Sequence, residues 1–513
     1  MNRAAVLLIV LLFRPAYAQP VATDAFDAGM ISRDYAAALA FMEPRILNAV
    51  PVSVLTVWGL GGLTALDPNL VAEQREGRIL LFSAGTRLTE EAAPRQNIPD
   101  EWAAAAVQLS NVAAAASTSV RRAGSQGIVQ SFFDELFNHL DPYSRYVAPN
   151  EAVQDRASRN GASGIGATLI EHNGTILVQT AVSDGPAALA GLHPGDIVIA
   201  VDGETVRGKG VDFVSGLVAG PEDTQVQLTW RNHEGRVRSA ELTRAVVPPE
   251  TVFSQRVDGV LLVRILGFDV TTATHLSEAL RAAVARPHPP HGIVLDLRGN
   301  RGGLLREAVE AASVLLAPGV VAYTAGRDPD SNHIWRSGEG ELAKGLPVAV
   351  LVDGRTASAA EAFSAALADR GRAVVIGSTT LGKGLVQTID PLPDGGELFV
   401  TWSRILAPRG WPIQGLGLMP QVCTSRGEAS LQHQLTALGE GVQPMAAAIE
   451  KHRAARAPLD PGEIVALRNP CPAAEGRGAD LEAARVLIEN PAAYAAALLP
   501  PLRDAEAVTL PSH

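Results

Sequence analysis

The feature that most constrains this chain is the alternation of short apolar runs with helical stretches between Val252 and Val422. The runs differ in their period, because strands bury continuous apolar residues whereas helices repeat them every three or four positions. In chain order, the pattern predicts strands at Val260–Ile265, Gly292–Leu297, Pro347–Val352 and Ala373–Ile376, and helices at Ala273–Ala285, Leu304–Leu316 and Ala359–Ala368. Such alternation predicts a layered α/β core in which loops at the strand ends carry the chemistry.

The rest of the chain divides into regions of different composition, as expected for 513 residues, which are too many for one ordinary core. Residues 19–155 are Ala-rich and predicted to be mainly helical, and the last helical run stops at Asp141-Pro142 because proline cannot continue a helix. Residues 156–246 show short β-type runs separated by Gly and Asp turns, which predicts a compact β module with two short helices. Residues 425–513 form an Ala- and Pro-rich extension with helical pieces and no recognisable chemistry.

The N-terminus has the pattern of a cleavable signal peptide over residues 1–18. Arg3 precedes an apolar run from Ala4 to Phe13, and Ala16-Tyr17-Ala18 supplies the small residues that a signal peptidase accepts. A membrane anchor is the alternative, but an apolar run ended by Arg14 and Pro15 is too short to span a bilayer. We therefore expect export, to the periplasm, and no stable membrane span.

Charge and cysteine content exclude several classes of protein. The formal net charge is -11 and no Lys/Arg cluster is present, so the chain lacks the electrostatic footprint of a nucleic-acid-binding protein. Its two cysteines, Cys423 and Cys471, are predicted to form one disulfide in an oxidising compartment, the alternative being two unrelated thiols. They form no Cys-x-x-Cys motif, and no metal or organic cofactor is expected.

Two glycine-containing stretches combine a buried strand, a turn and the start of a helix. The first, Leu295–Leu304, has a Gly-rich turn whose backbone N–H groups suit an anion or a developing oxyanion. The second, Val350–Glu361, places Ser358 just before a helix. Taken alone, Ser358 and Glu361 have the spacing of a capping box, which is the commoner role of such a serine.

A third stretch, Gly377–Gly384, places Lys383 between two glycines. It contains the Gly-x-x-x-x-Gly-Lys part of a phosphate-binding loop, but Gly384 stands where that motif needs Ser or Thr, and Leu385–Ile389 reads as a strand. A lysine that enters a buried strand is instead suited to desolvation, which lowers the pKa of its amine. Such a lysine can accept the proton of a hydroxyl nucleophile, as in known Ser–Lys pairs.

These stretches resemble the active-site segments of the C-terminal processing (tail-specific) peptidases. The resemblance rests on residues 356–361, 369–373 and 380–387, with Lys383 placed 25 positions after Ser358, and it extends to Leu140–Ser144 and Ile413–Pro420. It covers roughly residues 125–422. The resemblance implies a multidomain α/β protein with a crotonase-like catalytic core over 250–424, an inserted β-rich PDZ domain over 156–246, and a helical N-terminal region.

The resemblance also implies roles for individual residues. Ser358 would attack the scissile carbonyl and form an acyl-enzyme, Lys383 would take its proton, and Gln387 would orient the amine. The backbone N–H groups of Ala359 and Gly303 would form the oxyanion hole. Asp369 falls at a family-like position and is interpreted as structural. Arg301 and Ala360 are among the departures from the family pattern, and none of the departures involves the nucleophile, the base or Gln387.

The β module resembles a PDZ domain, in which Gly164, Ile165, Gly166 and Ala167 would form the carboxylate-binding loop. A peptide would add as an extra strand, with an apolar pocket near Phe213 and Leu217 taking its last side chain. The expected partners are therefore proteins or peptides with exposed apolar C-termini, and whether an adaptor activates the protein is left open. The leading hypothesis is an exported tail-specific serine endopeptidase; the alternative is a catalytically idle PDZ scaffold.

Overall fold

The computed structural model describes residues 26–338, 340–343 and 345–501, so the predicted signal peptide lies outside the described residues. The chain divides into two compact units. One comprises residues 26–43, Val50–Tyr146 and Leu392–Asp394, and the other comprises Pro44–Ala49, Val147–Pro391 and residues 395–501.

The first unit is mainly helical, as predicted, and also contains a small antiparallel sheet that the sequence analysis missed. Its helices are α1 (Ala28–Arg45), α2 (Val52–Gly61), α3 (Leu63–Leu66), α4 (Pro99–Ala116) and α5 (Thr118–Asn138), and its sheet has the order β1 (Leu70–Arg75), β2 (Arg78–Ser83), β3 (Thr86–Ala92). The turns between these strands are Glu76-Gly77 and Ala84-Gly85, all four residues having positive φ. Hairpin turns of this type usually carry Asn-Gly or Asp-Gly, so their sequence signal here is weak.

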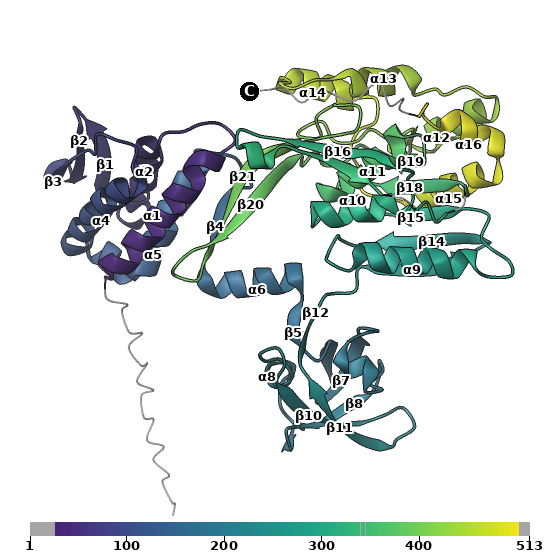
Figure 1. Ribbon diagram of the computed structural model, residues 1–513, viewed down its shortest axis with the longest axis horizontal. Helices are drawn as coiled ribbons and strands as arrows, with labels where there is room; N and C mark the ends of the chain where they lie inside the picture. The colour runs from purple at the N-terminus through teal and green to yellow at the C-terminus, as the bar shows by residue number, and fades with distance from the viewer. Residues whose placement is uncertain (1–25, 339, 344, 502–513) are drawn as a thin grey trace, which may run out of the picture. The chain divides into compact units, whose positions relative to one another are not determined.

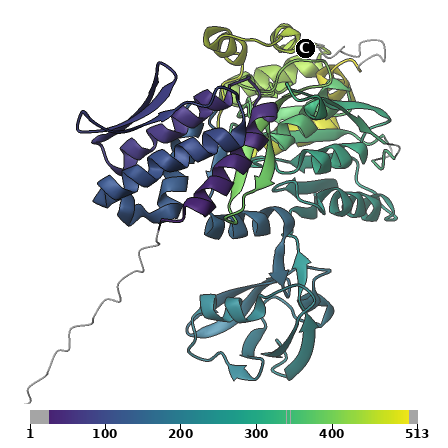
Figure 2. The same ribbon diagram turned by 60° about the vertical axis from the view of Figure 1, so that its left-hand side comes forward.

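The strand β4 (Arg145–Val147) spans the boundary between the two units, and the second unit continues with α6 (Pro149–Asn160) and the PDZ-like module. The module contains β5 (Ala162–Gly164), β6 (Ala167–His172), β7 (Thr175–Ala181), α7 (Pro186–Leu189), β8 (Ile197–Val201), β9 (Glu204–Thr205), α8 (Val211–Val218), β10 (Gln225–Arg231), β11 (Val237–Thr243) and β12 (Ala245–Val247). Its sheet has the order β11-β10-β8-β7-β6, which makes β6 an edge strand. The chain enters through β5 and leaves through β12, and these two strands pair with each other (Figures 1 and 2).

The remaining elements form an α/β core. They are β13 (Val252–Val257), β14 (Val260–Ile265), α9 (Thr272–Val284), β15 (Ile293–Asp296), α10 (Leu305–Ser313), β16 (Gly319–Ala325), η1 (Pro329–Ser331), β17 (His333–Ser337), β18 (Val348–Val352), α11 (Ala359–Asp369), β19 (Val374–Gly377), β20 (Leu385–Pro391), β21 (Glu397–Leu406) and β22 (Val422–Cys423). The central sheet has the order β13-β14-β15-β18-β19-β22, parallel from β14 to β22, and a second, antiparallel sheet has the order β17-β16-β21-β20. The predicted alternation of strands and helices is confirmed.

The C-terminal extension covers one face of the central sheet. It consists of α12 (Glu428–Gly439), α13 (Ala446–Ala454), α14 (Pro461–Arg468), α15 (Gly478–Glu489) and α16 (Pro491–Ala497), drawn in yellow-green to yellow in Figure 1. Apolar residues of α12, α15 and α16 pack against sheet residues such as Val294, Leu351 and Ile376. The opposite face packs against α9, α10 and α11. The extension thus supplies the third layer of the core.

Candidate active site

Three loops meet at one edge of the central sheet. The strands β15, β18 and β19 are parallel neighbours, so their carboxyl ends lie at the same edge. We call the segments that follow them the turn loop (residues 297–304), the serine loop (residues 353–358) and the lysine loop (residues 378–384). These loops contain three of the predicted site residues, Gly303, Ser358 and Lys383, and a fourth, Ala359, follows directly after the serine loop.

Ser358 has an unusual backbone conformation, with φ 58° and ψ -123°, between β18 and α11. A simple N-cap residue adopts the β region, so this serine departs from the geometry of an ordinary helix cap. A positive φ is uncommon for a residue other than glycine, and such strain costs about 1–3 kcal/mol. Hydrolases with a nucleophile on a strained strand-to-helix turn use this geometry to expose the hydroxyl.

The buried carboxylate of Glu361 ties the serine loop to the lysine loop. Its Oε2 accepts hydrogen bonds from the backbone N–H groups of Ser358 (2.8 Å) and Lys383 (2.9 Å). Its Oε1 accepts one from the N–H of Gly382 (2.7 Å) and one from the hydroxyl of Thr380. Since the same oxygen accepts from both nitrogens, the distance between the backbone nitrogens of Ser358 and Lys383 cannot exceed the sum of these two hydrogen-bond lengths.

Burial raises the pKa of Glu361, and the four donors around its oxygens oppose that rise. Every contact with these oxygens is a donor, so the ionised form fits the site best. From the sequence, Glu361 was predicted only to belong to a capping box. Its bonds to the lysine loop are tertiary contacts, for which the local sequence carries no signal.

The turn loop lies directly against Ser358. A Cβ on Gly302, which has φ 93°, would lie 2.8 Å from the Cβ of Ser358 and 2.9 Å from the backbone nitrogen of Ala359, so only glycine fits there. Asn300 fixes the loop: its side-chain oxygen accepts from the N–H of Gly302 (2.8 Å) and its carbonyl from the N–H of Ala357 (2.9 Å).

The two predicted oxyanion donors lie on either side of this contact. Ala359 is the first residue of α11, where N–H groups have no acceptor within the helix. Gly303, with φ 140°, bridges to Phe268. Among the described residues, no hydrogen-bond acceptor is found for the N–H of Ala359 or of Gly303. Both donors are therefore available to a ligand beside Ser358.

The lysine loop is not a phosphate-binding loop. A Cβ on Gly384 would lie 2.2 Å from the backbone nitrogen of Gln414, so the Ser or Thr of that motif could not fit. The chain continues into strand β20 rather than into a helix. Both structural requirements of the nucleotide-binding motif are absent from this loop.

Gln387 lies on β20, four residues beyond Lys383. Its amide nitrogen donates to the carbonyl of Leu385 (3.2 Å) and to the hydroxyl of Thr401 (3.0 Å). It also lines a cavity of about 870 Å³ over the second sheet, which Leu304 of the turn loop lines as well. This cavity therefore adjoins the turn loop and the strand that follows the lysine loop, and it is large enough for several side chains of a peptide.

Asp369, interpreted from sequence as structural, is fully buried at the end of α11. Its carboxylate accepts hydrogen bonds from Arg453 Nε (2.5 Å) and Trp411 Nε1 (2.9 Å). Arg453 belongs to α13, so this ion pair joins the core to the extension.

The predicted carboxylate-binding loop leads from β5 into the edge strand β6. Gly164 ends β5, Ile165 is buried in the module's core, Gly166 has φ 72°, and Ala167 begins β6. Phe213 on α8 is exposed, with Lys209 Nζ 4.8 Å from the centre of its ring.

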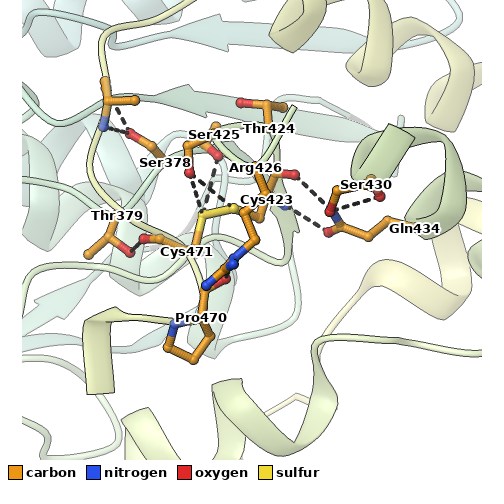
Figure 3. The surroundings of a disulfide bond; sticks show 12 residues. Ser378, Thr379, Cys423, Thr424, Ser425, Arg426, Ser430, Gln434, Pro470 and Cys471 are labelled. Carbon is orange, nitrogen blue, oxygen red and sulfur yellow. Dashed lines mark hydrogen bonds between the residues drawn. A yellow bond between two sulfur atoms is a disulfide. The ribbon is translucent and has the colours of Figure 1, made fainter. Parts of the chain in front are cut away.

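Cys423 and Cys471 form a disulfide, with their Cα atoms 5.7 Å apart (Figure 3). Cys423 ends β22 and Cys471 lies in the extension, three residues after α14, and both are fully buried. The bond therefore links the edge of the central sheet to the extension.

Comparison with known proteins identifies the two main parts of the chain. Residues 259–424 match the model of peptidase family S41, and residues 177–232 match the model of the PDZ domain. Over 302 residues the chain is 32% identical to the carboxy-terminal-processing protease of Bartonella bacilliformis, an alignment that covers 58% of this chain and 69% of that protein. This chain belongs to peptidase family S41.

Two further proteins align with this chain over a similar length. A "Probable CtpA-like serine protease" of Staphylococcus epidermidis is 34% identical over 310 residues, covering 60% of this chain and 62% of that protein. A solved structure of the photosystem II D1 C-terminal processing protease shares 28% identity over 56% of this chain and 81% of that chain, with a TM-score of 0.35.

Two features are absent from the described part of the chain. No helix there is both long enough and apolar enough to cross a bilayer. The same residues contain no cluster of His, Cys, Asp and Glu side chains that could hold a metal ion.

Proposed function

We propose that this S41 peptidase is an exported serine endopeptidase that captures the C-terminal tails of its substrates through the PDZ domain and cleaves by a Ser358–Lys383 mechanism. The observation that carries the proposal is the Glu361 carboxylate, which binds the backbones of both residues. A structural cap would need only the first of these bonds.

Ser358 Oγ attacks the scissile carbonyl while the neutral amine of Lys383 takes the hydroxyl proton. The resulting oxyanion receives hydrogen bonds from the N–H groups of Ala359 and Gly303, at the positive end of the α11 dipole. Collapse of this intermediate expels the amine product, which takes the proton from Lys383, and leaves an acyl-enzyme on Ser358. Water, deprotonated by Lys383, then releases the acid product, and Gln387 orients the amine throughout.

The PDZ domain supplies recognition. A substrate tail adds as a further strand to the edge strand β6, and its terminal carboxylate binds the N–H groups of the loop from Gly164 to Ala167. An apolar last residue suits the exposed apolar surface at Phe213. Export to the periplasm is supported by the signal pattern of residues 1–18 and by the buried disulfide, which is typical of an oxidising compartment.

The test is cleavage of an unstructured reporter with an apolar C-terminal tail by the mature protein and its variants. Ser358→Ala and Lys383→Ala are expected to lose at least about 10⁴-fold in kcat, the scale seen when a nucleophile or its base is removed. Lys451→Ala, which removes an exposed lysine of α13, is the matched control and should retain full activity.

Amidation of the reporter tail should raise KM and leave kcat unchanged, because it removes only the carboxylate. A wild type that binds the tail but never cuts it would support the idle scaffold instead. Unchanged cleavage by Lys383→Ala would refute the assignment of the base.

A further inference from the structure

The C-terminal extension returns to the active site after α14. The segment from Cys471 to Arg477, which we call the strap, runs between α14 and α15 without regular secondary structure. Its hydrogen bonds reach all three site loops, although the sequence of the extension showed no recognisable chemistry and left its role open.

The strap lies along the start of the lysine loop. Ser378 Oγ donates to the carbonyl of Ala474 (2.8 Å) and accepts from its N–H (3.0 Å). Thr379 Oγ1 donates to the carbonyl of Cys471 (Figure 3). Ser378 and Thr379 are buried, so these bonds are shielded from water. They immediately precede the residues that bind Glu361.

The strap also contacts the serine loop. The N–H of Gly354 donates to the carbonyl of Ala474 (2.7 Å), which is the same carbonyl that binds Ser378. The carboxylate of Asp353 accepts from the N–H of Gly476 (3.2 Å) through one oxygen and from the N–H of Gly299 (3.0 Å) through the other. Asp353 therefore joins the strap, the serine loop and the turn loop.

The turn loop meets the strap at Arg298. Its Nη1 donates to the carbonyl of Arg477 (2.7 Å) and lies 3.2 Å from the carboxylate of Asp480 on α15. The packing is close, since a Cβ on Gly476 would lie 2.4 Å from the Cδ of Arg298.

Arg468, the last residue of α14, holds the far side of the lysine loop. Its Nη2 donates to the carbonyl of Thr380 (2.9 Å), and its Nη1 to the carbonyls of Gly415 (3.0 Å) and Leu416 (2.9 Å). Gly415 in turn donates its N–H to the carbonyl of Gly382 (2.8 Å). The planar fork of an arginine can serve three carbonyls at once, which the single ammonium of a lysine cannot do in the same geometry.

The disulfide fixes the beginning of the strap. Cys471 is bonded to Cys423 on β22, which pairs with β19, the strand from which the lysine loop emerges. Without this bond the first residue of the strap would be held by hydrogen bonds and by its packing against Met419 and Ile449.

We propose that the strap, its disulfide and Arg468 are positioning elements of the active site, which hold the turn, serine and lysine loops in the arrangement that catalysis requires. This inference rests on the proposed peptidase function. Its consequence is that changes in the extension lower kcat rather than raise KM.

The experiment compares the mature wild type with Arg468→Met, Arg468→Lys and the double variant Cys423→Ser/Cys471→Ser in the reporter assay. Arg485→Met is the matched control, since it removes an arginine of the extension whose ion-pair partners, Asp258 and Glu482, lie outside the site loops. A second measurement follows the labelling rate of Ser358 by a fluorophosphonate, which needs a competent nucleophile but no bound peptide. Thermal denaturation and binding of a tail peptide report whether each variant is folded.

We expect kcat to fall about 10- to 100-fold in Arg468→Met and in the cysteine variant, the loss typical of a displacement near 1 Å, with KM within about twofold of wild type. Labelling should slow in parallel, Arg468→Lys should lie between Arg468→Met and wild type, and Arg485→Met should match wild type. If the cysteine variant is unfolded, the comparison of Arg468→Met and Arg468→Lys with wild type tests the inference by itself.

Folded variants with kcat and labelling rates within twofold of wild type would overturn the inference. So would a loss in Arg485→Met as large as that in Arg468→Met. A wild type that labels but does not cleave would contradict the proposed function, while slower labelling of Arg468→Met would still support the positioning role. A wild type that neither labels nor cleaves would overturn both.

Discussion

Replacing Glu361 by Gln tests the central element of the site with almost no change in shape. The glutamine keeps one oxygen acceptor and replaces the other by an NH₂ group that donates. If its oxygen faces Ser358 and Lys383, those two bonds survive, and the hydroxyl of Thr380 can rotate to accept from the new NH₂. The N–H of Gly382, now 2.7 Å from another donor, loses its partner.

The magnitude follows from this count. One buried N–H without an acceptor costs about 1–3 kcal/mol, and the two surviving bonds lose their charge assistance, about 1 kcal/mol each. Removing the buried charge offsets part of this loss, because burial disfavours the ionised form of Glu361. We therefore expect Glu361→Gln to lose about 2–4 kcal/mol of stability, and the displaced lysine loop to lower kcat about 10- to 100-fold.

The assay combines reporter cleavage with urea denaturation, compared by midpoint because the domains of a chain of this size unfold separately. Glu397→Gln is the matched control. Glu397 is also buried and accepts hydrogen bonds from Arg156 (2.9 Å) and Arg159 (2.7 Å), but it contacts none of the site loops. It should lower the midpoint and leave kcat unchanged. An unchanged kcat in a folded Glu361→Gln variant would refute the conclusion that this carboxylate sets the loop geometry.

Three further predictions concern single residues. Burial, together with neighbouring arginines, lowers the pKa of His452 to about 3. As the pH is lowered, the unfolded state therefore binds a proton at this histidine before the folded state does, and the free energy of unfolding should decrease from about pH 6.5 to pH 3. His452→Gln should reduce that slope by about 1.4 kcal/mol per pH unit in urea titrations. Burial and the charge of Asp394 raise the pKa of Asp34 to about 7, so the free energy of unfolding should decrease as the pH rises from about 4 to 7. In the same titrations, Asp34→Asn should therefore be more stable than wild type by on the order of 3 kcal/mol at pH 8, and by less at pH 5. Gly384→Ser, which completes the phosphate-loop motif, should lower the melting temperature and kcat without producing binding of a fluorescent ATP analogue, because its Cβ would meet Gln414; nucleotide binding would contradict this account.

Much of the fold was predictable because the core strands are buried on both faces. Strands such as Pro347–Val352 read as continuous apolar runs, and the helices between them have a clear period. The sheet of β1, β2 and β3 was missed because its turns lack the usual residues, and β16, β17 and β21 were not predicted.

The candidate site was predictable to a different extent. The local order of strand, turn and helix drew attention to the turn, serine and lysine loops, and the resemblance to a peptidase family assigned roles to Ser358, Lys383 and Gly303, which stay predictions. The contacts that hold these loops together were not predictable, since they join residues far apart in sequence: Ser378 and Ala474, for example, are 96 positions apart. Neither periodicity nor spacing can report such a pairing.

The pairing of β5 with β12 has a consequence for how substrate choice can change. The chain enters the PDZ domain through β5 and returns through β12, and these two strands are antiparallel neighbours. The whole domain is therefore connected to the peptidase core in the way that a turn is connected to the two strands of a hairpin. Residues 165–244 could then be replaced by a short turn, or by an unrelated peptide-binding fold with adjacent termini, without breaking a strand of the central sheet. Under the proposed function, the chemistry and the choice of target are therefore separable in this chain, and one can be exchanged while the other is kept.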